Sequence, residues 1–252
     1  MSSLTPALAV FLVSSIVSSA ASSPAVSPPY AGTLHELPAD ILTAKDPTTL
    51  IEFTEQGKGT RVNFDRRKDK FSPCEVWLYR AVYKGGRVIE VQVNQEFNAA
   101  KARKQAERFA SIIGQLPHCL RRDIDALWIH DGNKPMGGGN RSVTIHVAQA
   151  DELEAKGRLE EVFLHEAAHT SLDGDHAKSV GWQAAQAKDK KFISNYARDF
   201  TVREDVAESF PAWFETRQRR SRMPSAVIKT IEKTIPARLA YFDSLKLEMT
   251  AP

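Results

Sequence analysis

The residues whose types and spacing could do chemistry lie in one short segment, His165-Glu166-Ala167-Ala168-His169. If the segment is helical, residues four apart share a face with Cβ atoms about 5–6 Å apart, so both imidazoles can reach one metal ion. Zinc–nitrogen bonds of about 2.0–2.1 Å fit that separation. Glu166 follows the first imidazole and can accept a proton from a water activated by the metal. The alternative is a helix that carries two surface histidines.

A catalytic zinc ion usually takes a third protein ligand, and the sequence offers two sources for it. The near source holds Asp173, Asp175 and His176. In the pattern H-E-x-x-H-x-x-G-x-x-H a histidine stands six residues after the second one, where this chain has Asp175, and His176 comes one residue later. The far source is Glu204, which tertiary packing of a later helix could bring to the metal. We expect Glu204, and His176, Asp173 and Asp175 stay open as alternatives.

A family resemblance becomes specific at residues 204–210, EDVAESF. This segment resembles the third-ligand helix of the catalytic domain of anthrax lethal factor and of the Pro-Pro endopeptidases, which are zinc metallopeptidases of the gluzincin type. The resemblance covers about residues 159–214. It implies a zincin-like fold and the hydrolysis of peptide bonds in a peptide or protein substrate. It also implies a set of three zinc ligands, namely His165, His169 and Glu204.

The resemblance implies roles for further side chains around these ligands. Glu166 would be the general base. The family has a tyrosine shortly before the third ligand that helps to stabilise the oxyanion, and Tyr196 is the nearby candidate, although it lies one residue further upstream. Glu208 follows Glu204 by one helical turn, so it either hydrogen-bonds a ligating histidine or faces solvent. We expect Asp205 to be a surface or capping residue.

The hydrophobic pattern predicts an α+β fold, with a small, mixed β-sheet followed by an active-site helix and a helical C-terminal half. Alternation predicts strands at residues 75–82, 87–93, 124–130 and 142–147. Helical spacing predicts helices at residues 97–113, 151–172, 178–188, 202–219 and 223–246, the last broken at Pro236.

The glycine-rich segment 137–140 precedes the predicted strand 142–147. Glycines without a side chain predict a loop or bulge whose backbone can approach another segment closely. The strand behind it is either an ordinary strand or the edge strand along which an extended substrate pairs. Asn140 is also an acceptor for N-glycosylation if the chain passes through a eukaryotic secretory pathway.

The first 34 residues carry no charged side chain, and residues 7–17 form a short apolar run. Such a run followed by small residues is typical of a secretory signal, here with cleavage after Ala20 or Ala21. We therefore expect a secreted protein with a signal peptide at 1–21, a linker or N-terminal extension at 22–59 and a metallopeptidase domain at 60–252. No later stretch is long and apolar enough to predict a membrane anchor.

Secretion, if the prediction is right, bears on the redox state of the chain's two cysteines. An oxidising compartment favours a disulfide between Cys74 and Cys119, and the alternative is two separate buried thiols.

The composition excludes few classes of function. With 34 basic and 31 acidic side chains the net charge is +3, and the charges are interspersed, so nucleic acid is not an expected partner. The sequence thus predicts a secreted zinc metalloendopeptidase. The alternative is an inactive zincin-like domain that binds a metal or a protein partner, although such a domain has no need of Glu166.

Overall fold

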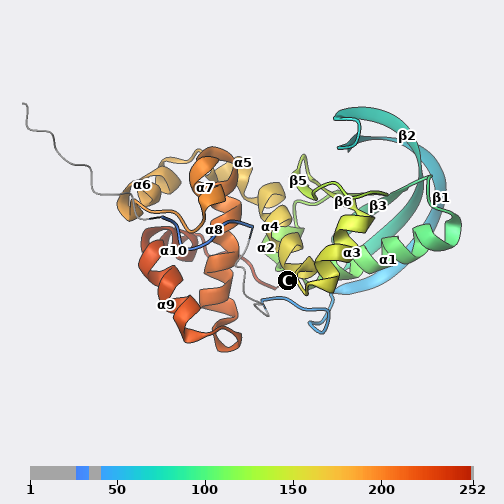
Figure 1. Ribbon diagram of the computed structural model, residues 1–252. Coiled ribbons are helices and arrows are strands. Elements are labelled where there is room, and N and C mark those ends of the chain that lie inside the picture. The colour runs from blue at the N-terminus through green and yellow to red at the C-terminus, as the bar shows by residue number, and fades with distance from the viewer. Residues whose placement is uncertain (1–26, 34–40, 251–252) are drawn as a thin grey trace, which may run out of the picture.

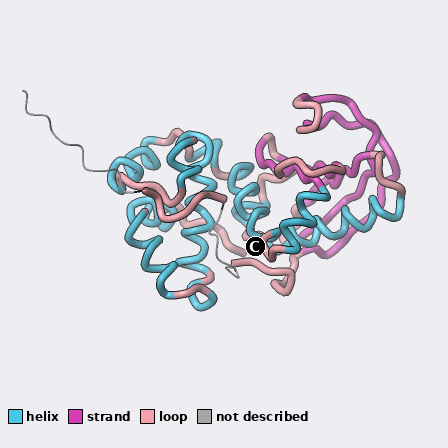
Figure 2. The backbone as a smooth tube through the Cα atoms, viewed as in Figure 1, coloured by secondary structure: helices cyan, strands magenta, loops and turns pink. Residues whose placement is uncertain are grey.

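A six-stranded mixed sheet forms one half of the molecule and helices form the other (Figures 1 and 2). The computed structural model describes residues 27–33 and 41–250. The predicted α+β class is confirmed. The strands are β1 (Leu50–Asp65), β2 (Lys70–Tyr83), β3 (Val88–Asn94), β4 (Ala126–His130), β5 (Gly137–Gly139) and β6 (Ser142–His146).

The order of the strands across the sheet is β1-β2-β3-β4-β6-β5. Strands β1, β2 and β3 are antiparallel neighbours, β3, β4 and β6 run parallel, and β5 returns antiparallel to β6. The long β1–β2 hairpin curls at its tip toward β5 and β6 (Figure 1). An edge contact between the rings of Phe71 on β2 and Trp128 on β4, 6.0 Å apart, joins the hairpin to the middle of the sheet.

Helices cover one face of the sheet and then continue into the second half. The apolar residues of β4 and β6, among them Ile129 and Ile145, are fully buried in the hydrophobic core. In chain order the helices are α1 (Ala99–Gln115), α2 (His118–Arg121), α3 (Val147–Ala155), α4 (Leu159–Ser171), α5 (Asp173–His176), α6 (Val180–Asp189), α7 (Asn195–Asp199), α8 (Thr201–Gln218), α9 (Ser225–Thr234) and α10 (Pro236–Ser244).

Helix α4 lies between the sheet and the C-terminal helices (Figure 1). Most of its residues are buried because it packs on β5 and β6 on one side and on α8 on the other. The C-terminal half has its own aromatic core, in which Phe242 of α10 contacts Trp182, Phe210 and Trp213. Asp205, which we expected at the surface, is instead fully buried beside the Arg238 guanidinium, with a 2.8 Å ion pair.

Three elements differ from the predictions. The sheet begins at Leu50 with β1, so part of the predicted linker 22–59 belongs to the folded domain. The predicted helix 151–172 is two helices, because Gly157 between α3 and α4 adopts a φ of 65° that ends α3. The predicted glycine loop 137–140 is the short strand β5 and the turn that follows it.

The position of β5 decides between the two alternatives for residues 142–147, an ordinary strand and an edge strand, in favour of the ordinary strand. That segment is β6, which pairs with β4 on one side and β5 on the other, so the edge strand at this end of the sheet is β5. Asn140 and Arg141 form the turn between them with positive φ angles of 49° and 55°. Two such residues give the tight turn that matches the twist of a hairpin.

The prediction of a Cys74–Cys119 disulfide is wrong, since both thiols are free. Cys74 lies on β2, where its sulfur contacts Asn63 Oδ1 across the hairpin at 3.3 Å. Cys119 lies on α2 and is fully buried in the core, and this burial raises the pKa of its thiol to about 12. The cysteines thus lie on two different elements, β2 and α2, and are not joined.

The predicted signal peptide at 1–21 lies outside the described residues. Within the part of the chain that the structure describes, no helix has both the length and the apolar character needed to cross a membrane.

Candidate metal centre and active site

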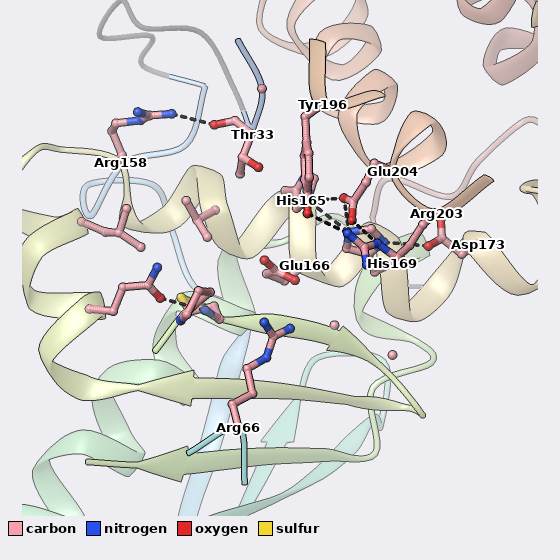
Figure 3. Close-up of a pocket in the computed structure, with 18 residues that line it drawn as sticks. Thr33, Arg66, Arg158, His165, Glu166, His169, Asp173, Tyr196, Arg203 and Glu204 are labelled. Carbon is pink, nitrogen blue, oxygen red and sulfur yellow. Dashed lines mark hydrogen bonds and ion pairs between the residues drawn. The ribbon is translucent and has the colours of Figure 1, made fainter. Parts of the chain in front are cut away.

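Three side chains from two helices converge on one point, as Figure 3 shows. The Nε2 atoms of His165 and His169 on α4 are 3.1 Å apart. Oε2 of Glu204 on α8 lies 3.1 Å from Nε2 of His169 and 3.6 Å from Nε2 of His165. Two ligands of a tetrahedral zinc ion with bonds near 2.05 Å are about 3.3 Å apart. The described residues thus contain a group that could hold a metal ion, and it matches the predicted ligands.

Two of the three candidate ligands are buried, and His169 is partly buried. The exposed fractions of His165 and Glu204 are 2% and 3%. Helix α8 presents Glu204 in its first turn, where the N–H groups of the helix terminus favour a carboxylate. The backbone N–H of Glu204 donates to the carbonyl of Phe200 at 2.8 Å, which fixes the start of the helix.

A carboxylate lies behind each histidine. Nδ1 of His169 and Oδ2 of Asp173 are 2.7 Å apart, so Asp173 orients the ring and leaves Nε2 facing the ligand group. Oε1 of Glu208 lies 3.5 Å from Nδ1 of His165. Glu208 is buried and also accepts a hydrogen bond from the Ser194 hydroxyl at 2.6 Å, so it is not the solvent-facing residue that we considered.

The second oxygen of Glu204 has a partner of its own. Nε of Arg203 donates to Glu204 Oε1 at 2.7 Å, and Nη2 of the same guanidinium donates to the Tyr196 hydroxyl at 3.2 Å. Glu204 therefore offers one oxygen to a metal and uses the other to hold Arg203 beside Tyr196. Burial first, and then hydrogen bonding with Glu204, raise the pKa of Tyr196, so its hydroxyl keeps a proton to donate.

The electrostatics of the group favour a positive charge at its centre. Burial alone would lower the pKa of His169, but hydrogen bonds with Asp173 and Glu204 outweigh it and raise this pKa to about 10. Burial alone would raise the pKa of Glu204, but hydrogen bonds with His165 and His169 hold it below its ordinary value. A metal ion that binds these side chains would compete with a proton for His169.

Glu166 lines the same cavity, which has a volume of about 680 Å³. Figure 3 shows its carboxylate between the ligand group and the strand below. Strand β5 can approach α4 this closely because it is made of glycine. A Cβ atom on Gly138 would lie 1.8 Å from the carbonyl oxygen of Glu166 and 2.9 Å from Cβ of His169. The Thr170 hydroxyl joins the same elements, since it accepts from the Gly139 N–H at 2.9 Å.

The structure brings together five of the residues singled out from the sequence and separates the alternatives. Tyr196 on α7 lines the cavity with Glu166 and the three ligands. His176 instead pairs its Nδ1 with the Tyr241 hydroxyl at 2.8 Å, and Asp175 is exposed. Asp173 contacts a ligating histidine from behind and does not complete the group.

Two parts of the cavity wall were not predicted from the sequence. Gly32 and Thr33 line it, because residues 30–33 run alongside α7. The Thr33 N–H donates to Glu208, and the Thr33 carbonyl accepts from Arg158 at 2.6 Å. The second part is Arg66 from the tip of the β1–β2 hairpin. Neither has a local motif, since both reach the cavity only through tertiary folding.

Comparisons with protein-family models, with curated proteins and with solved structures give no match. The residues of the site itself are therefore the basis for a function.

Proposed function

We propose that the chain is a zinc-dependent metalloendopeptidase with a zincin-like fold. The observation that carries the proposal is that two histidine nitrogens and a glutamate oxygen lie within 4.8 Å of one another while Glu166 lines the same cavity. Two histidines and a glutamate are a known ligand set of catalytic zinc, which leaves a fourth position for water or substrate.

The chain's own residues account for the proton transfers of peptide hydrolysis. A bound zinc ion would supply Lewis acidity, polarising the scissile carbonyl and lowering the pKa of water. Glu166 accepts the proton of the attacking water and returns it to the leaving nitrogen. Tyr196, held by Arg203, donates a hydrogen bond to the negative charge that develops on the carbonyl oxygen.

The substrate would lie extended along β5. This strand is the edge of the sheet beside Glu166, and Gly138 and Gly139 line the cavity. Main-chain pairing at a sheet edge is a general way to bind an extended peptide. Because β5 lies directly against α4 at Gly138, a peptide paired along the free edge of this strand would pass beside Glu166.

The deciding experiment is the substitution Glu166→Gln. We expect this variant to bind one zinc ion per chain with wild-type affinity and to lose about 100- to 10,000-fold in kcat on a broad peptide library, because it removes a proton acceptor and no ligand. Asp175→Asn changes an exposed carboxylate nearby and should leave both properties unchanged. A Glu166→Gln protein that still cleaves at the wild-type rate would contradict the proposed mechanism.

The rival function is a domain that binds metal or a partner without turnover. It would be favoured if wild-type protein binds zinc tightly but cleaves no peptide of the library. The presence of Glu166 in the cavity favours the enzyme, because a binding site needs no proton acceptor there.

Export of the chain is proposed from residues 1–21 alone. N-terminal sequencing of protein recovered outside the cell should then begin at Ala21 or Ser22.

A further inference from the structure

Two adjacent arginines at the tip of the β1–β2 hairpin, Arg66 and Arg67, differ in their contacts. Arg67 is held by ion pairs with Asp65 and Glu96, at 2.9 and 2.8 Å, and also donates to the Asp131 carbonyl at 3.1 Å. These contacts tie the hairpin tip to the segments that follow β3 and β4. Arg67 therefore fixes where its neighbour, Arg66, is placed.

Arg66 extends from this anchored tip into the cavity that contains the metal ligands. Its guanidinium lies directly on β5, because a Cβ atom on Gly137 would be 2.1 Å from Nη2 of Arg66. Figure 3 shows the guanidinium pointing from below toward Glu166. Arg66 also borders a smaller cavity of about 220 Å³ on the other side of the glycine strand. It thus lies at the edge strand along which a substrate would run.

Among the described charged side chains that line the larger cavity, Arg66 has no partner of opposite charge. Arg158 donates to the Thr33 carbonyl and Arg203 to Glu204. The acidic side chains are also assigned, since Glu204 and Asp173 contact the histidines and Glu166 is the proposed base. Among the described residues, Arg66 has no ion pair or side-chain hydrogen bond, so its guanidinium is a cation presented to whatever occupies the cavity.

We propose that Arg66 is a specificity residue that binds a substrate carboxylate close to the scissile bond. The inference rests on the proposed peptidase function and names the class of substrate, namely acidic peptides. A guanidinium matches a carboxylate with two parallel hydrogen bonds, and a peptide lying on β5 would exclude water from this pair. The carboxylate is supplied either by an Asp or Glu side chain or by the C-terminus of the peptide.

The test uses matched peptides. Each pair differs by Glu against Gln at one of the three positions on either side of the cleaved bond, and each peptide is made with a free and with an amidated C-terminus. We expect kcat/KM to favour the carboxylate about 10- to 100-fold at one position, the range for a hydrogen-bonded charge. A preference for Glu identifies a side chain as the source, and a preference for the free C-terminus identifies the terminal carboxylate.

The matched variants are Arg66→Glu and Lys70→Glu. Both reverse one charge on the same hairpin tip, but Lys70 does not line either cavity, so it controls for long-range attraction of acidic peptides. Arg66→Glu should abolish the preference or invert it toward basic peptides and keep zinc binding, whereas Lys70→Glu should keep the preference. Wild-type protein that cleaves Glu and Gln peptides equally, or an Arg66→Glu protein with unchanged selectivity, overturns the proposal.

A binding measurement separates this inference from the proposed function. Affinities of the same peptides are measured by calorimetry with the zinc-loaded Glu166→Gln protein, with and without Arg66→Glu. If wild-type protein cleaves nothing but acidic peptides bind preferentially and depend on Arg66, the peptidase function fails and the carboxylate site stands. If peptides are cleaved but their binding and turnover ignore Arg66, the function stands and the inference fails.

Discussion

At the scale of single residues, two members of the candidate metal-binding group are each fixed by a neighbour. Asp173 holds His169 and Arg203 holds Glu204, both through a 2.7 Å contact to the atom that faces away from the other ligands. Such outer partners set the ring orientation and the tautomer of a ligating histidine. The site is thus organised before a metal binds, because tertiary contacts already bring the three ligand atoms together.

Substitutions of Glu204 and His176 test which of the two residues is the third metal ligand. We expect Glu204→Gln to weaken zinc affinity by more than about 100-fold, beyond the usual effect of losing an outer partner. His176→Ala should keep the metal affinity and lose about 1 kcal/mol of stability with the hydrogen bond to Tyr241. Competition with a chelator measures the first quantity and urea unfolding the second. Metal loss in His176→Ala together with metal retention in Glu204→Gln would refute Glu204 as the third ligand.

The ligands could be predicted from the sequence and Arg66 could not, for a physical reason. His165 and His169 are joined by helical periodicity, which the sequence displays directly. Helical periodicity does not identify Glu204, because its helix reaches α4 only by tertiary packing. The resemblance of residues 204–210 to a known family supported its selection. Arg66 depends on the curl of a hairpin and on the missing side chain of Gly137, neither of which leaves a local pattern.

At the scale of elements, the contact between β5 and α4 shapes the active site, and Gly138→Ala tests it. The added Cβ would meet the Glu166 carbonyl, so β5 must move. We expect this to cost about 1–3 kcal/mol, as for other overpacked sites, and to lower kcat/KM. Gly174→Ala is the control, since nothing lies within 4 Å of its added Cβ on α5, and it should be neutral or slightly stabilising. Equal stabilities in urea unfolding would argue against the close contact.

The predicted elements were most accurate where one periodicity ran without interruption. Helices α1, α6 and α8 follow the predicted segments closely, and the break at Pro236 separates α9 from α10 as expected. Strand β1 was not predicted because its middle, residues 54–60 with Glu55 and Lys58, is polar and largely exposed. Strand β5 escaped because a run of glycine has no strand propensity, and its conformation comes from pairing with β6.

At the scale of the whole molecule, buried polar groups join distant parts of the chain. Arg238 on α10 is fully buried and pairs with Asp189 at 3.0 Å and with Asp205 at 2.8 Å. This network links α6, α8 and α10 around the helix that carries Glu204. In the sheet half, the corresponding feature is a pair of fully buried histidines, His130 on β4 and His146 on β6, whose rings stack with centroids 5.5 Å apart.

This histidine pair predicts sensitivity of the fold to mild acid. Burial first, and then the neighbouring His130 and Arg67, lower the pKa of His146 from 6.5 to about 4, with Asp65 opposing them. Between these pH values the unfolded chain binds a proton that the folded protein excludes. The stability that neutral His146 contributes is therefore complete above pH 6.5 and is lost as the pH falls toward 4, by about 3 kcal/mol.

The measurement is the free energy of unfolding in urea at pH 7 and pH 4, for wild type and His146→Leu. Leucine fills a similar volume and does not titrate, so the variant should lose about 3 kcal/mol less than wild type over this interval. Titrating groups that do not contact His146 are common to both proteins and cancel in the difference, including His169, whose raised pKa acts with the opposite sign. Equal losses in the two proteins would mean that His146 takes up its proton inside the folded sheet. The fold would then tolerate a charge on a side chain whose two ring nitrogens have no hydrogen-bond partner among the described residues.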